Sequence, residues 1–132
     1  MDEKLESLLR APNFAHVATV LPDGAPHSVP VWTGMEGDRI AFFTQPGSRK
    51  ARNLEADPRV AISITDHESP YRMAHVRGRV AETLESDGAL EAIDRLSHKY
   101  TGRPFPMRSG IVFLVEPERV FSMNLPFEHT PA

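Results

Sequence analysis

Apolar and β-branched residues recur along this chain in short runs that predict β-strands, and turn-forming residues such as Pro22-Asp23-Gly24 separate them. The first three runs are joined by short turns, which predicts an antiparallel meander. Gly78 lies within the longest run and indicates a bulge or a bend. The seven runs are residues 14–20, 27–32, 39–44, 59–65, 71–84, 111–115 and 119–123.

Three other segments show the apolar spacing of amphipathic helices, namely residues 2–11, 48–56 and 86–100. Asp2 and Ser48 are suitable N-caps for the first two, because their side-chain oxygens can accept from first-turn N–H groups. Seven strands with two or three helices predict one mainly β (α+β) domain over residues 1–132. We expect a small antiparallel barrel that carries helices at its edges.

Composition narrows the function classes. Of the 132 residues, 40% are hydrophobic and 25% charged, which suits a packed core. A net charge of -3 argues against nucleic-acid binding, and the absence of cysteine excludes thiolate nucleophiles and cysteine-ligated metals. The six histidines show no i, i+4 pair of the kind that binds metal on a helix. No apolar run approaches the roughly 18 residues of a membrane span, and the first residues do not resemble a signal peptide. We therefore expect a cytoplasmic protein without a membrane segment.

Residues 47–54 carry the clearest chemical signal. A glycine break and a capping serine precede Arg49, Lys50 and Arg52 in the first helical turns. Free N–H groups and the positive end of the helix dipole favour an anion at the same place as these cations. Asn53 shares the helix face of Lys50 and could donate an amide hydrogen bond. By itself, the pattern fits an ordinary capped surface helix equally well.

Longer stretches resemble a known family. Residues 44–60 are similar to the K-x-R-N-L-x-x-D-P-R-V segment of the pyridoxamine-phosphate-oxidase-like split-barrel flavoproteins. Residues 26–32, 70–80 and 99–106 match further segments in the same order, so the likeness runs from about position 8 to 121. More narrowly, the chain resembles the F420-dependent oxidoreductases, or class B flavin/deazaflavin reductases.

The resemblance implies an FMN-binding type of split β-barrel with six or seven antiparallel strands, and a homodimer with cofactor at the subunit interface. It implies coenzyme F420, with FMN as the alternative, and hydride transfer to a small electron-poor organic acceptor. It places Ser48, Arg49, Lys50 and Asn53 at the cofactor phosphate, Pro30, Trp32, Phe43 and Thr44 near the ring, and Pro70, Tyr71 and Arg72 along the ring or tail.

Two other functions stay open at this point. One is an FMN-dependent oxidase or reductase on the same fold. The other is a non-catalytic protein that carries the deazaflavin or binds another planar ligand such as haem. Trp32 and Phe43 fit simple core aromatics as well. No catalytic residue is assigned, although Tyr71 or Arg72 could polarise an acceptor.

Overall fold

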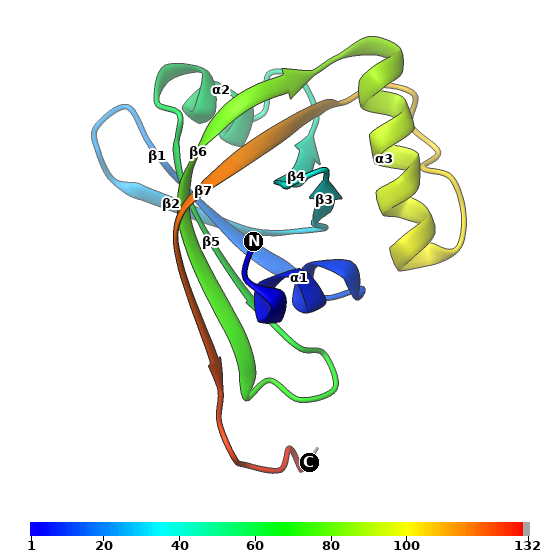
Figure 1. The fold of residues 1–132 in the computed structure, drawn as a ribbon. Coiled ribbons are helices and arrows are strands. Elements are labelled where there is room, and N and C mark those ends of the chain that lie inside the picture. The colour runs from blue at the N-terminus through cyan, green and yellow to red at the C-terminus, as the bar shows by residue number, and fades with distance from the viewer. Residues whose placement is uncertain (131–132) are drawn as a thin grey trace.

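The computed structural model describes residues 1–130. Its strands form one antiparallel sheet in the order β2-β1-β5-β6-β7-β4-β3 (Figure 1). The strands are β1 (Ala15–Val20), β2 (Pro26–Val31), β3 (Gly34–Glu36), β4 (Arg39–Thr44), β5 (Arg59–Thr65), β6 (Arg72–Leu84) and β7 (Ile111–Asn124). The helices are α1 (Glu3–Arg10), α2 (Arg49–Ala56) and α3 (Ser86–Thr101). The predicted antiparallel α+β fold with seven strands and three helices is confirmed.

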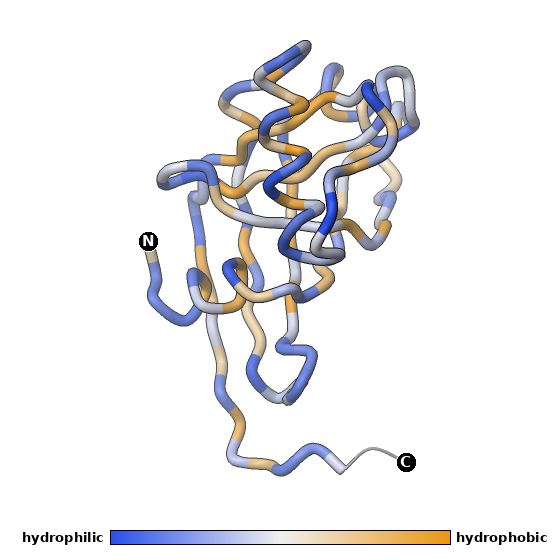
Figure 2. The backbone as a smooth tube through the Cα atoms, turned by 90° about the vertical axis from the view of Figure 1, so that its right-hand side faces the viewer, coloured by the Kyte–Doolittle hydropathy of each residue, from blue (hydrophilic) through white to orange (hydrophobic). Residues whose placement is uncertain are grey.

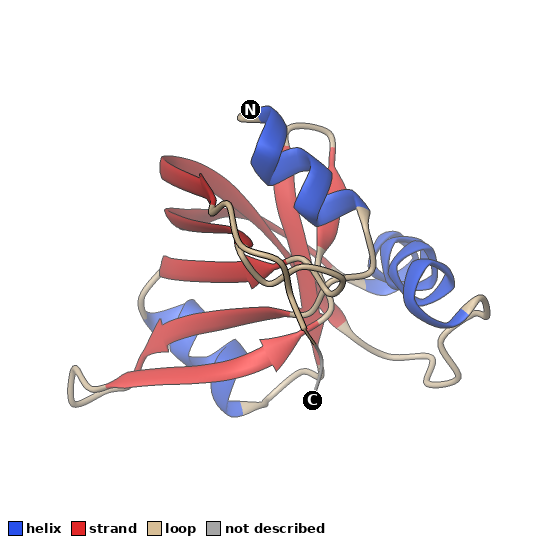
Figure 3. Ribbon diagram, turned by 90° about the horizontal axis from the view of Figure 1, so that it is seen from below, coloured by secondary structure: helices blue, strands red, loops and turns tan. Residues whose placement is uncertain are grey.

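The helices begin where the sequence places their caps. The Asp2 carboxylate accepts from the Leu5 N–H at 2.9 Å, and the Ser48 hydroxyl accepts from the Ala51 N–H at 3.2 Å. α3 ends at Gly102, whose φ of 76° is the left-handed conformation that glycine adopts without strain. The three helices lie at separate places around the strands (Figure 3). None of the helices within residues 1–130 is long and apolar enough to cross a membrane.

Two hydrophobic cores flank β4 and β7. Ile40 and Phe42 point into the main core, which α1 and α2 also enter. Ala41 faces the other way, into a second core with α3 residues such as Ile93. The continuous apolar runs of β4 and of the first half of β7 follow from this, because both of their faces are buried. Figure 2 shows the hydrophobic stretches concentrated in such strands and the hydrophilic stretches in the turns.

The predicted meander is wrong beyond its second strand. β1 pairs with β2 as expected, but β4 pairs with β7 and with β3, not with β2. β3 occupies residues 34–36, which the sequence pattern assigned to a turn. A three-residue strand is too short to produce a periodic signal. In consequence, β2 and β3 are the two edges of the sheet.

The last two predicted strands are one continuous strand. β7 passes through Pro117, which the sequence pattern placed in a separating loop. Pro117 is opposite Gly78 of β6, and the pairing register shifts between Arg77 and Gly78. An irregularity at this point tolerates proline, since a residue there need not donate to the ladder. The predicted bulge or bend at Gly78 is confirmed.

Candidate functional site

The turn between β4 and α2 presents the start of a helix. Gly47 has a φ of 78°, which turns the chain so that Ser48 can cap α2. The Thr44 and Ser48 hydroxyls are 3.0 Å apart and share a hydrogen bond. Ser48 satisfies the Ala51 N–H, whereas the first-turn N–H groups of Arg49 and Lys50 have no acceptor within the helix. The turn therefore offers N–H groups and a hydroxyl pair at the positive end of the helix dipole.

Lys50 is the half-buried cation of this turn. Burial lowers the pKa of its ammonium group below the ordinary lysine value. No hydrogen bond or ion pair among residues 1–130 involves its side chain, whereas seven arginines form ion pairs with carboxylates. A partly desolvated charge without a partner is costly, and an anion beside it would relieve that cost.

Asn53, in contrast, has its amide occupied within the chain. Its side chain is 1% exposed, its amide nitrogen donates to the Thr19 hydroxyl at 3.0 Å, and its amide oxygen accepts from Arg49 Nε at 2.9 Å. Asn53 thus ties α2 to β1 and fixes Arg49 at the helix start. Its predicted contact with a phosphate stays a prediction.

A hollow of about 280 Å³ lies next to this helix start. We call it the aromatic hollow, and it is lined by Phe14, Pro30, Trp32, Phe43, Lys50 and Phe105. Four of the residues that the resemblance places at a cofactor meet there, three at the ring and Lys50 at the phosphate. The other predicted ring and phosphate residues, Thr44, Ser48, Arg49 and Asn53, do not line the hollow.

The aromatic side chains of the hollow contact one another. Trp32 lies edge-on to Phe43, with ring centroids 6.1 Å apart, and edge-on to Phe105 at 6.0 Å. Phe43 and Phe105 are themselves 5.1 Å apart. Edge-to-face packing of this kind holds rings in fixed orientations. The result is an apolar wall of aromatic rings, and among residues 1–130 Lys50 is the one cation that lines it.

The aromatic hollow opens at an edge of the sheet. Pro30 and Trp32 belong to edge strand β2 and the residues just after it, whereas Phe43 comes from β4, which does not pair with β2. Phe105 arrives from the loop after α3. The hollow thus lies where β2 and β4 are not paired with each other.

Pro70, Tyr71 and Arg72 are not brought to the hollow by this chain. They lie at the β5–β6 hairpin, whose loop is at the bottom of Figure 1, whereas α2 is at the top. Arg72 pairs with Asp66 at 3.2 Å, and the Tyr71 ring packs edge-on against Phe127 at 5.3 Å. Within one chain, the predicted site residues therefore form two separate groups.

Sequence reasoning assigned no role to Phe14, Tyr100 and Phe105. Tyr100 lies in the predicted helix of residues 86–100 and Phe105 lies after it, but neither is among the residues that the resemblance places at a cofactor. The signal that could have found Tyr100 and Phe105 is the stretch 99–106, which is one of the segments that resemble the family. The convergence of Tyr100 and Phe105 on Trp32 is a property of the tertiary structure, because Trp32, just after β2, is far in sequence from α3 and the loop that follows it.

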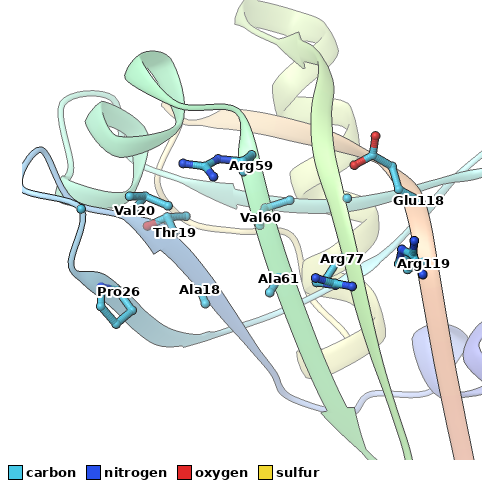
Figure 4. Close-up of a pocket in the computed structure, with 12 residues that line it drawn as sticks. Ala18, Thr19, Val20, Pro26, Arg59, Val60, Ala61, Arg77, Glu118 and Arg119 are labelled. Carbon is cyan, nitrogen blue, oxygen red and sulfur yellow. The ribbon is translucent and has the colours of Figure 1, made fainter.

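A second, larger hollow of about 580 Å³ lies on the face of β1, β5, β6 and β7 (Figure 4). Its floor includes Ala18 and Ala61, and Arg59, Arg77, Glu118 and Arg119 surround it. Arg77 and Arg119 are directly opposite each other on β6 and β7, and Arg59 extends from β5 toward β1. None of the residues predicted at a cofactor lines this hollow. Among residues 1–130, no group of three or more histidine or acidic side chains could hold a metal ion.

The family match and the similar curated proteins point to the same protein family. Residues 1–124 match the family described as pyridoxamine 5'-phosphate oxidase. A pyridoxine/pyridoxamine 5'-phosphate oxidase of Cupriavidus metallidurans is 40% identical over 112 residues, which are 83% of this chain and 48% of that protein. The corresponding oxidase of Rubrobacter xylanophilus is 37% identical over 89 residues, or 65% of this chain and 41% of that one. This chain thus spans less than half the length of either oxidase.

A solved structure matches along its whole length. It is described as an F420 reductase, with a TM-score of 0.80 and 32% identity, and the match covers 92% of this chain and 98% of that one. The two chains therefore share both fold and size.

Proposed function

The chain belongs to the pyridoxamine 5'-phosphate oxidase family, and from this premise we propose that it is an oxidoreductase that uses coenzyme F420. In this proposal the aromatic hollow binds the cofactor ring, and the start of α2 binds its phosphate. The substrate is a small, electron-poor organic acceptor. The chemistry that F420 supplies when bound is hydride donation to an activated C=C or C=N bond, completed by a proton.

The single observation that carries this proposal is the position of Lys50 at the border of an apolar aromatic wall. A planar, phosphorylated heterocycle matches both features, because its ring suits aromatic side chains and its phosphate suits an ammonium group. Neither a purely apolar ligand nor a free anion would use both. The residues present therefore fit a flavin-like group.

The likeness to the F420 reductase favours F420 over FMN as the cofactor, because it covers 92% of this chain at a TM-score of 0.80 and 32% identity. The second candidate function, an FMN-dependent oxidase or reductase, is favoured by the 40% identity to the C. metallidurans oxidase.

The chain's own residues bind and orient in this proposal. Ser48, Arg49 and Lys50 hold the phosphate, and Asn53 keeps Arg49 in place from beneath. Trp32 and Phe43 fix the position of the ring and present an apolar surface that limits access of water. In this proposal the cofactor supplies the hydride chemistry, which agrees with the lining of the aromatic hollow, where residues 1–130 place no acid–base pair.

We further propose a homodimer in which the hairpin of one protomer completes the hollow of its partner. Pro70, Tyr71 and Arg72 lie at the β5–β6 hairpin, at the opposite end of the molecule from α2, which carries Lys50 (Figure 1). In this proposal they reach the cofactor from the partner protomer, across the dimer interface. Tyr71 or Arg72 would then be able to polarise the acceptor. A dimer also explains why the predicted residues form two groups.

A row of residues on the outer face of the sheet suits such an interface. We call it the outward row, and its members are Pro30, His16, Ser63, His75 and Phe121, paired in this order across β2, β1, β5, β6 and β7. All five are exposed, none is acidic or permanently charged, and Phe121 is 49% exposed. Pro30 also lines the aromatic hollow, so a partner on this face would lie beside the site.

Titration of the purified protein with F420 and with FMN tests the assignment, with Trp32 fluorescence as the readout. We expect tighter binding of F420. Lys50→Ala should weaken that binding by about 1–3 kcal/mol, because a charge-assisted hydrogen bond is lost. Lys4→Ala removes an exposed lysine of α1 and is the matched control. Equal affinity of Lys50→Ala and wild-type protein would exclude the assigned phosphate site.

Turnover separates an enzyme from a carrier. Reduced F420 is mixed in a stopped-flow instrument with the protein and a panel of enones, imines and quinones. Oxidation that depends on the protein is the expected result. Tight binding without turnover of any acceptor would favour a non-catalytic carrier. Protein-dependent oxidation of reduced FMN (FMNH2), supplied in a parallel experiment, without oxidation of reduced F420 would favour the second candidate function.

A further inference from the structure

Tyr100, near the end of α3, holds three segments of the chain together. Its hydroxyl accepts from the Thr33 N–H at 3.0 Å and donates to the carbonyl oxygen of Asn13 or of Thr33. Asn13 precedes β1, and Thr33 links β2 to β3. A single phenol thus fixes the backbone on both sides of the β1–β2 hairpin relative to α3.

Lys99 strengthens the same junction from the neighbouring position. Its ammonium group donates to the Leu9 carbonyl at 2.6 Å and to the Thr33 carbonyl, and lies 4.8 Å from the centre of the Tyr100 ring. Leu9 belongs to the last turn of α1, where a cation is favoured by the helix dipole. Burial lowers the pKa of Lys99 to about 8, and burial also raises the pKa of Tyr100.

The Tyr100 ring also contacts Trp32, a residue of the aromatic hollow. It stacks on Trp32 with centroids 5.1 Å apart and an angle of 6° between the planes. Trp32 has Tyr100 stacked on one face and makes T-shaped contacts with Phe43 and Phe105. The residue after Trp32 is Thr33, whose backbone Tyr100 also binds. The plane of the indole is therefore set both by its own backbone and by the stacked phenol.

We infer that Tyr100 is a positioning residue, which orients Trp32 so that the aromatic hollow is preformed for a planar cofactor. The inference rests on the proposed function only for the identity of the ligand. The fixed indole is a property of the free protein and can be measured without any cofactor. Preformed sites bind more tightly because less side-chain freedom is lost on binding.

A Tyr100 that only stabilised the fold would also be sensitive to substitution. The experiment therefore has to distinguish a loss of stability from a loss of Trp32 orientation. Tyr100→Phe removes the hydroxyl and keeps the stacked ring. His98→Gln changes an exposed residue of the same helix turn and is the matched control. Trp32 is the sole tryptophan, so its emission reports on this position alone.

In the free protein we expect Trp32 of the wild type to show only the slow anisotropy decay of the whole molecule. Tyr100→Phe should add a fast component and make Trp32 more accessible to acrylamide, while His98→Gln should do neither. A fast component already present in the wild type would overturn the inference, and this measurement needs no variant that might fold poorly. An unchanged decay in a folded Tyr100→Phe variant would overturn it as well.

Cofactor binding gives the second readout, through a double-mutant cycle with Trp32→Phe. Binding is followed by the absorbance of F420 that remains free after ultrafiltration. Tyr100→Phe should raise the dissociation constant about two- to tenfold, because the indole is then less well oriented before the cofactor binds. The effect should largely vanish in the Trp32→Phe background if Tyr100 acts through Trp32. Equal effects of Tyr100→Phe in both backgrounds would overturn the inference. If the wild type bound neither F420 nor FMN, the proposed function would be overturned, but the anisotropy result for Trp32 would still hold.

Discussion

The buried amide of Asn53 donates a hydrogen bond of 3.0 Å to the hydroxyl of Thr19, and this contact joins α2 to β1. The same amide accepts from Arg49, one residue before Lys50. The position of the helix start, where we propose a phosphate binds, therefore depends on a contact inside the core. We therefore expect stability and binding to be coupled through Asn53.

We predict that Asn53→Ala lowers the free energy of unfolding by about 1–3 kcal/mol, because buried polar partners lose their hydrogen bond. Binding of F420 should weaken too, since Arg49 is released from its fixed position. Urea unfolding and fluorescence titration measure the two effects. Glu55→Ala, an exposed change on the same helix, is the control and should alter neither. An Asn53→Ala variant as stable as the control would show that the amide contributes little.

Local signals in the sequence were enough for most of the fold. Ser48 and Asp2 mark helix starts because capping depends on neighbouring N–H groups, and β5 coincides with its predicted span of residues 59–65. Strand pairing was less predictable. Nothing near β4 indicates that it pairs with β7, some 70 residues later, because that choice is made by burial of both faces against two cores.

The candidate site was predictable only in part, for the same reason. The start of α2 is a local pattern, so Ser48, Arg49 and Lys50 could be identified from spacing. The aromatic hollow joins β2, β4 and the loop after α3, so Phe105 and the Trp32–Tyr100 stack follow from tertiary packing alone. The position of Pro117 within a strand was not predictable from local sequence either, because the irregularity that accommodates it depends on Gly78 in the paired strand β6.

Two glycines should respond to alanine in opposite directions. A Cβ at Gly78 would lie 2.3 Å from the Glu116 carbonyl oxygen, a backbone atom that cannot move freely. We therefore expect Gly78→Ala to destabilise the protein by about 1–3 kcal/mol. A Cβ at Gly88, in α3, would meet no atom within 4 Å, so Gly88→Ala should stabilise the protein by about 0.5–1 kcal/mol. Thermal unfolding of both variants checks the pair, and a shift of equal sign would contradict the bulge.

The proposed homodimer predicts that a bulky charged substitution at Ser63, at the centre of the outward row, prevents dimer formation. Ser63→Arg places a large cation between His16 and His75, and a second copy would bring another one close to it. We expect this variant to sediment as a monomer and to lose most of its F420 affinity, since Pro70 to Arg72 of the partner could no longer complete the site. Gly88→Arg adds the same charge on exposed α3 and should stay dimeric. A dimeric Ser63→Arg variant would place the interface elsewhere.

The pH dependence of binding should reveal Lys50 directly. An anion at the start of α2 favours the ammonium form, whereas burial in the free protein lowers the pKa of Lys50 below 10.5. Affinity for F420 should therefore hold while Lys50 is protonated and fall as pH rises through that lowered pKa. Arginine keeps its charge throughout this range, so Lys50→Arg should lose this fall.

Comparing the wild type with Lys50→Arg also cancels the contribution of other titrating groups to the pH dependence of affinity. Lys99 also has a lowered pKa, of about 8, but it is present in both proteins. Titrations at intervals between about pH 7 and pH 10 would measure the difference. Parallel curves for the two proteins would show that Lys50 does not bind the ligand, because its deprotonation would then have no effect on affinity.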